Sequence, residues 1–213
     1  MLLPINPSQP EINKIQHIVE ILRTGGVIIY PTDTIYGLGC DIFNKKAVDR
    51  IYKIKKRQKN KFFSFICADF KQVGEFAVCS NSAFRIMKRV LPGPFTFILS
   101  ASHKAPRSVI EHKRRTVGIR IPDHAICLEM VRVLGNPIVT TSVNYAGEDV
   151  MNDPVFMERE FGRSVDAVID AGVLPIEPST IVDATDDEIS IVRQGKGHLD
   201  MGPSPNAISA ETR

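Results

Sequence analysis

The residues best suited to chemistry lie in a loop near the N-terminus, just after the apolar run Val27–Tyr30. The loop carries the hydroxyls of Thr32 and Thr34, followed by Gly37 and Gly39. Hydroxyls at a strand end can donate and accept hydrogen bonds where α/β sheets bind ligands, and glycines allow close backbone approach. The pattern is neither a P-loop nor a GxGxxG motif, so a tight strand-to-helix turn explains it as well as a binding site does.

A dense run of Lys and Arg over residues 53–61 is the second candidate. If the preceding helix continues, Lys53 and Arg57 lie four residues apart on one face, where like charges repel. A bound anion would remove that repulsion, which favours anion binding by this basic run. The alternative is a solvated basic helix end, stabilised in part by the helix dipole.

Polar groups also follow the expected strand at residues 138–141, which itself ends in two threonines. Ser142 and Asn144 project to the same side if the extended geometry continues. Such groups can hold phosphate oxygens or a metal-bound water, although Asn144 and Gly147 also suit a simple turn. Three more polar residues lie at other expected strand ends: Arg120, Ser179 and Arg193. Each is a weak signal alone, because exposed Arg and Ser are common.

The elements that would position these groups alternate between helix and strand. Ser8 and Glu11 read as a capping box for a helix that Gly25-Gly26 ends, and Asp123 as the cap of a helix running to Leu134. Further helices are expected at about 45–56, from Ser80 or Ser82 to Val90, and at 155–161. Strands are expected at 27–30, 62–67, 96–100, 116–121, 138–141, 165–169, 181–183 and 189–193.

This alternation predicts one α/β domain over residues 1–201, with a mixed sheet covered by helices. Residues 202–213 are rich in Pro, Ser and Asn and are expected to form a flexible tail. No apolar run approaches the roughly 20 residues that span a bilayer, and the N-terminus lacks a signal-peptide pattern, so a cytoplasmic location is expected. The four cysteines and five histidines show no metal-binding spacing, and no structural metal is expected.

The net charge of +3 conceals an uneven distribution. Residues 1–120 hold 21 Lys and Arg against 8 Asp and Glu, a balance of +13, whereas residues 121–213 hold 6 against 16, a balance of −10. Within one domain, this split indicates a cationic surface that meets an anionic partner. A solvated basic face without a ligand is the alternative.

Taken together and in this order, the motifs resemble the YrdC/YciO family, the threonylcarbamoyl-AMP synthases of tRNA modification. The resemblance covers about residues 10–197. The matching segments are Pro31-Thr32-Asp33-Thr34-x-Tyr36-Gly37-Leu38, Lys55-x-Arg57 with Lys61, Leu91-Pro92-Gly93-Pro94-x-Thr96, Val117-Gly118-x-Arg120-x-Pro122, Ser142-x-Asn144, Ser179-Thr180-Ile181-Val182-Asp183 and Arg193-x-Gly195.

The resemblance implies a twisted open α/β sheet with a positively charged concave face. It also implies a reaction that joins threonine, bicarbonate and ATP, with Mg²⁺, into threonylcarbamoyl-AMP and pyrophosphate. That product would feed the N6-threonylcarbamoyl modification of tRNA adenosine 37 through downstream tRNA-modification proteins. The residues implied to act in catalysis are Lys55, Arg57, Ser142 and Asn144. Those implied to bind ATP are the same four with Lys61, Thr96 and Arg193, and those implied to bind threonine are Thr32, Thr34, Arg120 and Ser179.

Three segments look closer to the YciO branch of the family: Phe84-Arg85-x-Met87-Lys88, Lys113-Arg114-Arg115-Thr116-Val117-Gly118 and Thr185-Asp186-Asp187. The chain also departs from the synthase pattern at two places. Phe62-Phe63 follows Lys61 where the family commonly has Pro-Leu, and Thr141 and Val143 flank Ser142 where many synthases have proline and alanine. Two alternatives therefore stay open. One is a protein that binds double-stranded RNA or tRNA with little or no synthase activity, and the other is carbamoyl transfer to a different acceptor.

Overall fold

The computed structural model describes residues 1–56, 63–111 and 113–200. The helices in these residues are α1 (Ile12–Arg23), α2 (Lys45–Ile54), α3 (Phe70–Phe76), α4 (Asn81–Val90), α5 (Ala125–Leu134) and α6 (Pro154–Phe161). The strands are β1 (Leu2–Pro4), β2 (Ile28–Tyr30), β3 (Gly37–Gly39), β4 (Ser64–Ile66), β5 (Ala77–Val78), β6 (Phe95–Ala101), β7 (Thr116–Arg120), β8 (Ile138–Ser142), β9 (Ala167–Asp170), β10 (Thr180–Asp183) and β11 (Ser190–Arg193).

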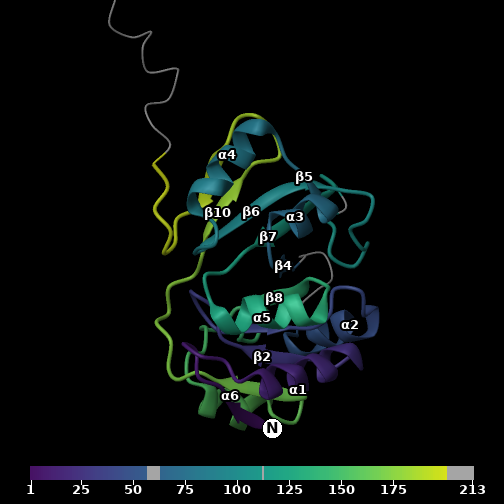
Figure 1. The fold of residues 1–213 in the computed structure, drawn as a ribbon, viewed down its shortest axis with the longest axis vertical. Coiled ribbons are helices and arrows are strands. Elements are labelled where there is room, and N and C mark those ends of the chain that lie inside the picture. The colour runs from purple at the N-terminus through teal and green to yellow at the C-terminus, as the bar shows by residue number, and fades with distance from the viewer. Residues whose placement is uncertain (57–62, 112, 201–213) are drawn as a thin grey trace, which may run out of the picture.

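The described strands form one mixed sheet in the order β1-β9-β2-β3-β8-β4-β7-β6-β10-β11, with β5 paired to β6. The sheet contains both parallel pairs, such as β4 with β7 and β6 with β10, and antiparallel pairs, such as β3 with β8 and β4 with β8. The predicted single α/β domain with a mixed, helix-covered sheet is confirmed (Figure 1).

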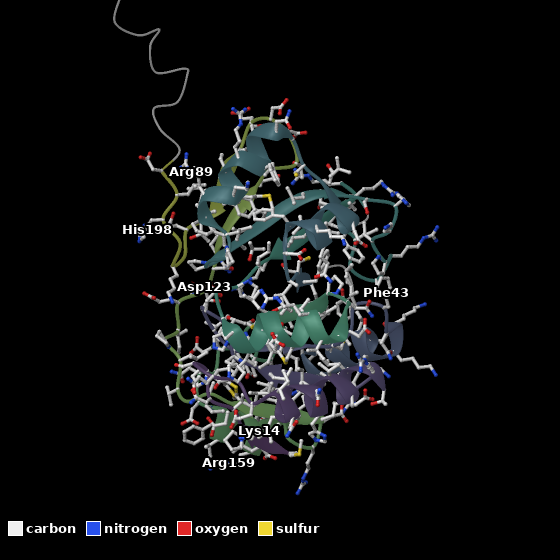
Figure 2. All side chains as sticks on the ribbon, in the orientation of Figure 1. Lys14, Phe43, Arg89, Asp123, Arg159 and His198 are labelled. Carbon is white, nitrogen blue, oxygen red and sulfur yellow. The ribbon has the colours of Figure 1, made fainter. Side chains whose placement is uncertain are left out.

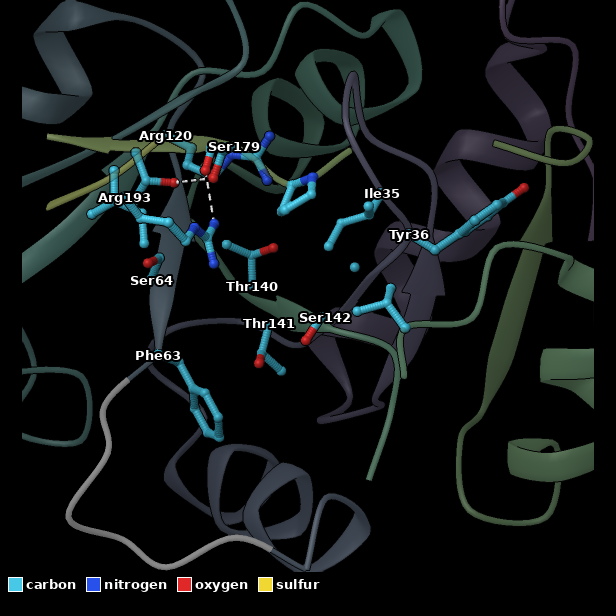
Figure 3. A pocket seen from close by; sticks show the side chains of 15 residues that line it. Ile35, Tyr36, Phe63, Ser64, Arg120, Thr140, Thr141, Ser142, Ser179 and Arg193 are labelled. Carbon is cyan, nitrogen blue, oxygen red and sulfur yellow. Dashed lines mark hydrogen bonds between the residues drawn. The ribbon is translucent and has the colours of Figure 1, made fainter. Parts of the chain in front are cut away.

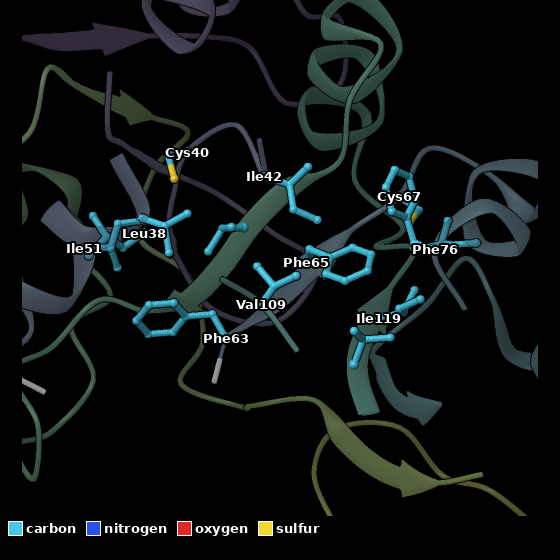
Figure 4. Close-up of a cluster of buried hydrophobic side chains, with 14 of the residues drawn as sticks. Leu38, Cys40, Ile42, Ile51, Phe63, Phe65, Cys67, Phe76, Val109 and Ile119 are labelled. Carbon is cyan, nitrogen blue, oxygen red and sulfur yellow. The ribbon is translucent and has the colours of Figure 1, made fainter. Parts of the chain in front are cut away.

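Alternation along each strand separates two apolar cores. Ile28 and Tyr30 of β2 pack with α1 and α5, which lie side by side on one face of the sheet (Figure 1). Val27 and Ile29 point to the other face, into a larger cluster that includes α2 and Phe65 (Figure 4). Because successive strand side chains face opposite ways, a sheet covered on both sides needs these nearly continuous apolar strands.

Several element boundaries differ from the sequence-based expectation. The capping box at Ser8 was wrong: α1 begins after Glu11, whose carboxylate accepts instead from the Asn6 backbone N–H. Helix α5 has His124 rather than Asp123 at its N-cap position, where no side chain caps the helix, and the Asp123 backbone N–H donates to Asp33. The predicted cap at Ser80 is present, and its hydroxyl accepts from the Ala83 N–H at 3.2 Å.

Four elements were not expected at all: β1, β3, α3 and β5. Strand β3 reads Gly-Leu-Gly, a composition that disfavours strands, and was interpreted as part of a turn. Its pairing on both sides, with β2 and with β8, overrides that local preference.

No described helix is long and apolar enough to cross a membrane. The four cysteines are free thiols, with Cys40, Cys67 and Cys127 buried. After β11 the chain runs along α4, where Arg89 donates to the carbonyl of Asp200 at 3.3 Å close to His198 (Figure 2). The expected tail, residues 202–213, lies outside the described residues.

Replacing Gly39 by alanine should destabilise the protein by about 2 kcal/mol or more, because overpacking strains a close-packed interior. A Cβ atom there would lie 2.1 Å from the backbone oxygen of Val139 in the neighbouring strand. Chemical denaturation of Gly39→Ala measures the loss. Gly74→Ala is the matched control: it lies in α3, no atom is within 4 Å of its added Cβ, and equal or higher stability is expected.

Candidate active site

A cavity of about 360 Å³ opens where the ends of strands from both halves of the sheet meet. Hydroxyl groups and two guanidinium groups form much of its wall, and Ile35, Phe63 and Val150 add apolar surface. The full lining is Ile35, Tyr36, Gly37, Phe63, Ser64, Thr96, Arg120, Thr140, Thr141, Ser142, Val150, Pro178, Ser179, Ile181 and Arg193 (Figure 3).

Arg120 and Arg193 lie together on one side of this cavity, with Ser179 beside them (Figure 3). Arg193 ends β11 and donates through Nη2 to the carbonyl of Ser179 at 2.7 Å. The Ser179 hydroxyl is 2.8 Å from that of Thr96. Burial, and then the charge of Arg120, lower the pKa of the Arg193 guanidinium. Two cations in a half-enclosed space favour the entry of an anion.

The loop between β2 and β3 holds the guanidinium of Arg120 through two side-chain hydrogen bonds. Its Nη2 donates to Asp33 Oδ1 at 2.7 Å and to the Thr34 hydroxyl at 2.9 Å. The side chains of Arg120 and Asp33 are only 7% and 8% exposed. Nε of Arg120 is also buried, yet it has no hydrogen-bond partner among the described residues. A buried donor without a partner costs free energy, so a ligand oxygen would be stabilised there.

The hydroxyls of Thr32 and Thr34 are buried and already paired. Thr32 donates to the carbonyl of Ile35 at 2.6 Å, so Thr34 must be the donor in the 3.0 Å contact between the two threonines. Thr34 in turn accepts from Arg120. Neither threonine lines the cavity. Thr34 therefore affects the site through its bond to Arg120, and Thr32 through its bond to Thr34. For either hydroxyl to contact a ligand directly, these hydrogen bonds would have to exchange.

Lys55, Ser142 and Asn144 form one network. Lys55 directly follows α2, is 2% exposed, and donates to the carbonyls of Ser142 (2.6 Å) and Asn144 (2.9 Å) and to Asn144 Oδ1 (2.7 Å). The Ser142 hydroxyl also donates to Asn144 Oδ1 at 2.7 Å, as expected for side chains that project to the same side. Among the three, only Ser142 lines the cavity.

Two of the predicted phosphate-binding residues, Arg57 and Lys61, lie outside the described residues. The structure thus brings Thr96, Arg120, Ser142, Ser179 and Arg193 to one cavity, with Lys55 and Asn144 attached to its wall through Ser142.

Comparison with known proteins identifies the family to which this architecture belongs. A model of the Sua5/YciO/YrdC family, described as "Telomere recombination", matches residues 20–195, more than half of the chain. This chain belongs to the Sua5/YciO/YrdC family. The uncharacterized protein YciO of Escherichia coli K12 is 38% identical over 196 residues, which cover 92% of this chain and 95% of YciO.

Solved structures agree with that assignment. The crystal structure of E. coli YciO superimposes with a TM-score of 0.88 and 37% identity, over 93% of this chain and 97% of YciO. P. abyssi Sua5, solved in complex with L-threonine, matches with a TM-score of 0.85 and 28% identity, over 92% of this chain but only 57% of Sua5. A threonylcarbamoyl-AMP synthase of Coxiella burnetii is 35% identical over 80% of this chain and 92% of its own length.

Sequence reasoning missed several residues that line this Sua5/YciO/YrdC-type cavity or support its wall. Asp33 stood inside the highlighted loop but received no role, and Thr140 and Thr141 were noted only as neighbours of Ser142. Lys196, whose ammonium donates to the Asp33 carbonyl at 2.6 Å, was not considered. Its partner is 163 positions away, so no local pattern could have indicated the contact.

Replacing Lys55 by methionine should lower the free energy of unfolding by about 2–4 kcal/mol, because three partly buried acceptors lose a charged donor. Urea denaturation of Lys55→Met measures the change. Lys53→Met, an exposed position in the same helix, should stay within about 0.5 kcal/mol of wild type. Equal effects in the two variants would contradict a structural role for the Lys55 ammonium.

Proposed function

We propose that this chain is a threonylcarbamoyl-AMP synthase that serves the N6-threonylcarbamoyl modification of adenosine 37 in tRNA. The observation that carries the proposal is the convergence of Arg120 and Arg193 on one hydroxyl-lined cavity. The name of the C. burnetii relative and the L-threonine in the Sua5 crystal structure support it.

The cavity suits both ends of a threonine molecule. The carboxylate would pair with Arg120, whose buried Nε needs an acceptor, and with the hydroxyl of Ser179. Ile35 and Val150 offer apolar surface to the methyl group. Thr32 and Thr34 would contribute by supporting Arg120.

The reaction needs charge neutralisation and positioning more than a protein nucleophile. The threonine amine and bicarbonate give a carbamate and water. A carbamate oxygen then bonds to the α-phosphorus of ATP, while the bond from that phosphorus to the bridging oxygen breaks and pyrophosphate leaves. Thr96, Ser142, Asn144 and Arg193 would contact the nucleotide, with Arg57 and Lys61 supplying further cations. Lys55 would reach a phosphate by exchanging one of its three acceptors for a phosphate oxygen.

Mg²⁺ would arrive with the nucleotide. The described residues contain no group of three or more His, Cys, Asp or Glu side chains arranged to hold a metal. A wall with several hydroxyls would suit Mg²⁺, which usually keeps several waters and is held largely by substrate phosphates. When bound with ATP, Mg²⁺ would share the charge of the triphosphate.

Pyrophosphate should be released only when threonine, bicarbonate, ATP and Mg²⁺ are all present. Arg193→Gln should lower kcat/KM by about tenfold to a hundredfold, because the variant loses one charge-assisted hydrogen bond to the nucleotide. Arg114→Gln removes an exposed arginine that pairs with Asp183 away from the cavity and should retain activity. A folded wild-type protein that makes no threonylcarbamoyl-AMP would refute the proposal, and turnover only with carbamoyl phosphate would favour transfer to another acceptor.

RNA binding with little synthase activity is the second candidate. Exposed basic side chains on α2 and α4 support it, including Lys45, Lys46, Arg85 and Lys88. Binding driven by phosphate contacts should weaken by roughly one log unit per log unit of salt for each contact. Electrophoretic titration of double-stranded RNA at several salt concentrations measures this slope, and salt-insensitive binding would argue against the basic surface as its origin.

A further inference from the structure

Asp33 lies behind the cavity wall, where it contacts Arg120 without lining the cavity. Both oxygens of its carboxylate are used: Oδ1 accepts from Arg120 Nη2 at 2.7 Å, and Oδ2 accepts from the Asp123 backbone N–H at 3.1 Å. Its backbone carbonyl accepts from Lys196 Nζ at 2.6 Å. Asp33 is therefore tied to two separate parts of the chain, residues 120–123 and Lys196, and each of its carboxylate oxygens already accepts one hydrogen bond.

These contacts determine which part of the Arg120 guanidinium remains available. The two protons of Nη2 are directed to Asp33 and to Thr34, whose own hydroxyl proton is committed to Thr32. The Nε–H stays buried and unpaired among the described residues. Because both Nη2 protons are bonded, Asp33 and Thr34 fix that end of the guanidinium, and a ligand in the cavity can meet only its other donors.

We propose that Asp33 is the positioning residue for Arg120, which it holds so that the unpaired guanidinium donors face the carboxylate of the substrate. The proposal rests on the proposed function, because it takes threonine as that substrate. It also accounts for the charge arrangement: Arg120 and Arg193 repel each other at the cavity, and the Asp33 carboxylate keeps Arg120 in place before any ligand neutralises the pair.

Two explanations of Asp33 predict opposite signs. Replacing Asp33 by asparagine removes a negative charge, which by itself raises the positive potential of the cavity and tightens anion binding. If positioning is what matters, the same change frees Arg120 and weakens threonine binding in spite of the higher potential. The direction of the change in the Kd for threonine thus shows whether Asp33 positions Arg120 or only lowers the positive potential of the cavity.

The experiment measures threonine binding by calorimetry to wild type, Asp33→Asn and Asp166→Asn. Asp166 is a matched control, because it also accepts from one arginine, Arg50, and from one backbone N–H, that of Val27, but Arg50, unlike Arg120, does not line the cavity. Asp33→Asn should raise the Kd at least tenfold, and Asp166→Asn should leave it within twofold. Unchanged or tighter binding by folded Asp33→Asn would overturn the proposal while leaving the proposed function intact.

A second readout needs no substrate. The ¹⁵N–¹H signal of Arg120 Nε, assigned by its absence in Arg120→Lys, should be protected from solvent exchange in wild type and broadened or lost in Asp33→Asn. If wild type binds no threonine, the proposed function fails, and this signal alone decides whether Asp33 positions Arg120. An unchanged signal would then overturn the inference.

Should Asp33→Asn not fold, Thr34→Val takes its place. It removes the other acceptor of Nη2 and keeps the Asp33 charge. A rise in the threonine Kd of about threefold to tenfold is expected, with the Nε signal broadened. Wild-type values for both measurements would overturn the proposal.

Discussion

The burial of one ammonium group constrains the whole site. A charge taken out of water is tolerated only where fixed acceptors surround it, and Lys55 finds three such acceptors on Ser142 and Asn144. In addition, the backbone N–H of Ala146 donates a hydrogen bond to the Lys55 carbonyl at 2.9 Å. The end of α2 and the chain leaving β8 are thereby held together, and the cavity wall at Ser142 follows from that attachment.

Much of the fold could be predicted from the sequence because its signals are local. The spacing of Ile15, Val19 and Leu22 defines the buried face of α1, and the alternation in β2 assigns its residues to two cores. The Gly-Leu-Gly strand β3 could not be predicted, because its glycines carry no strand preference. Their small size is what the position needs, since a Cβ on Gly37 would lie 2.9 Å from the ring of Tyr30.

The sequence predicted which residues lie at the candidate site better than it predicted which of their atoms are free to bind a ligand. Hydroxyl and arginine motifs gave five residues that the structure places at the cavity, namely Thr96, Arg120, Ser142, Ser179 and Arg193. Which hydroxyls are free, and which are already bonded, depends on partners far away in the chain. Thr34 is occupied by Arg120, 86 positions later, and no spacing rule reports that contact. Residue type therefore indicates the chemistry available, while tertiary contacts decide which atoms can use it.

The contacts that assemble the cavity have a consequence for the way the protein is made. Arg120 meets Asp33 across 87 positions, Lys55 meets Asn144 across 89, and Thr96 meets Ser179 across 83. Arg193 and Lys196, near the end of the described chain, complete the same region. A nascent chain, which emerges from its N-terminus at about 5–20 residues per second, therefore has no complete cavity until Lys196 has been synthesised. Substrate can stabilise the finished protein by binding it, but it cannot guide the earlier steps of folding.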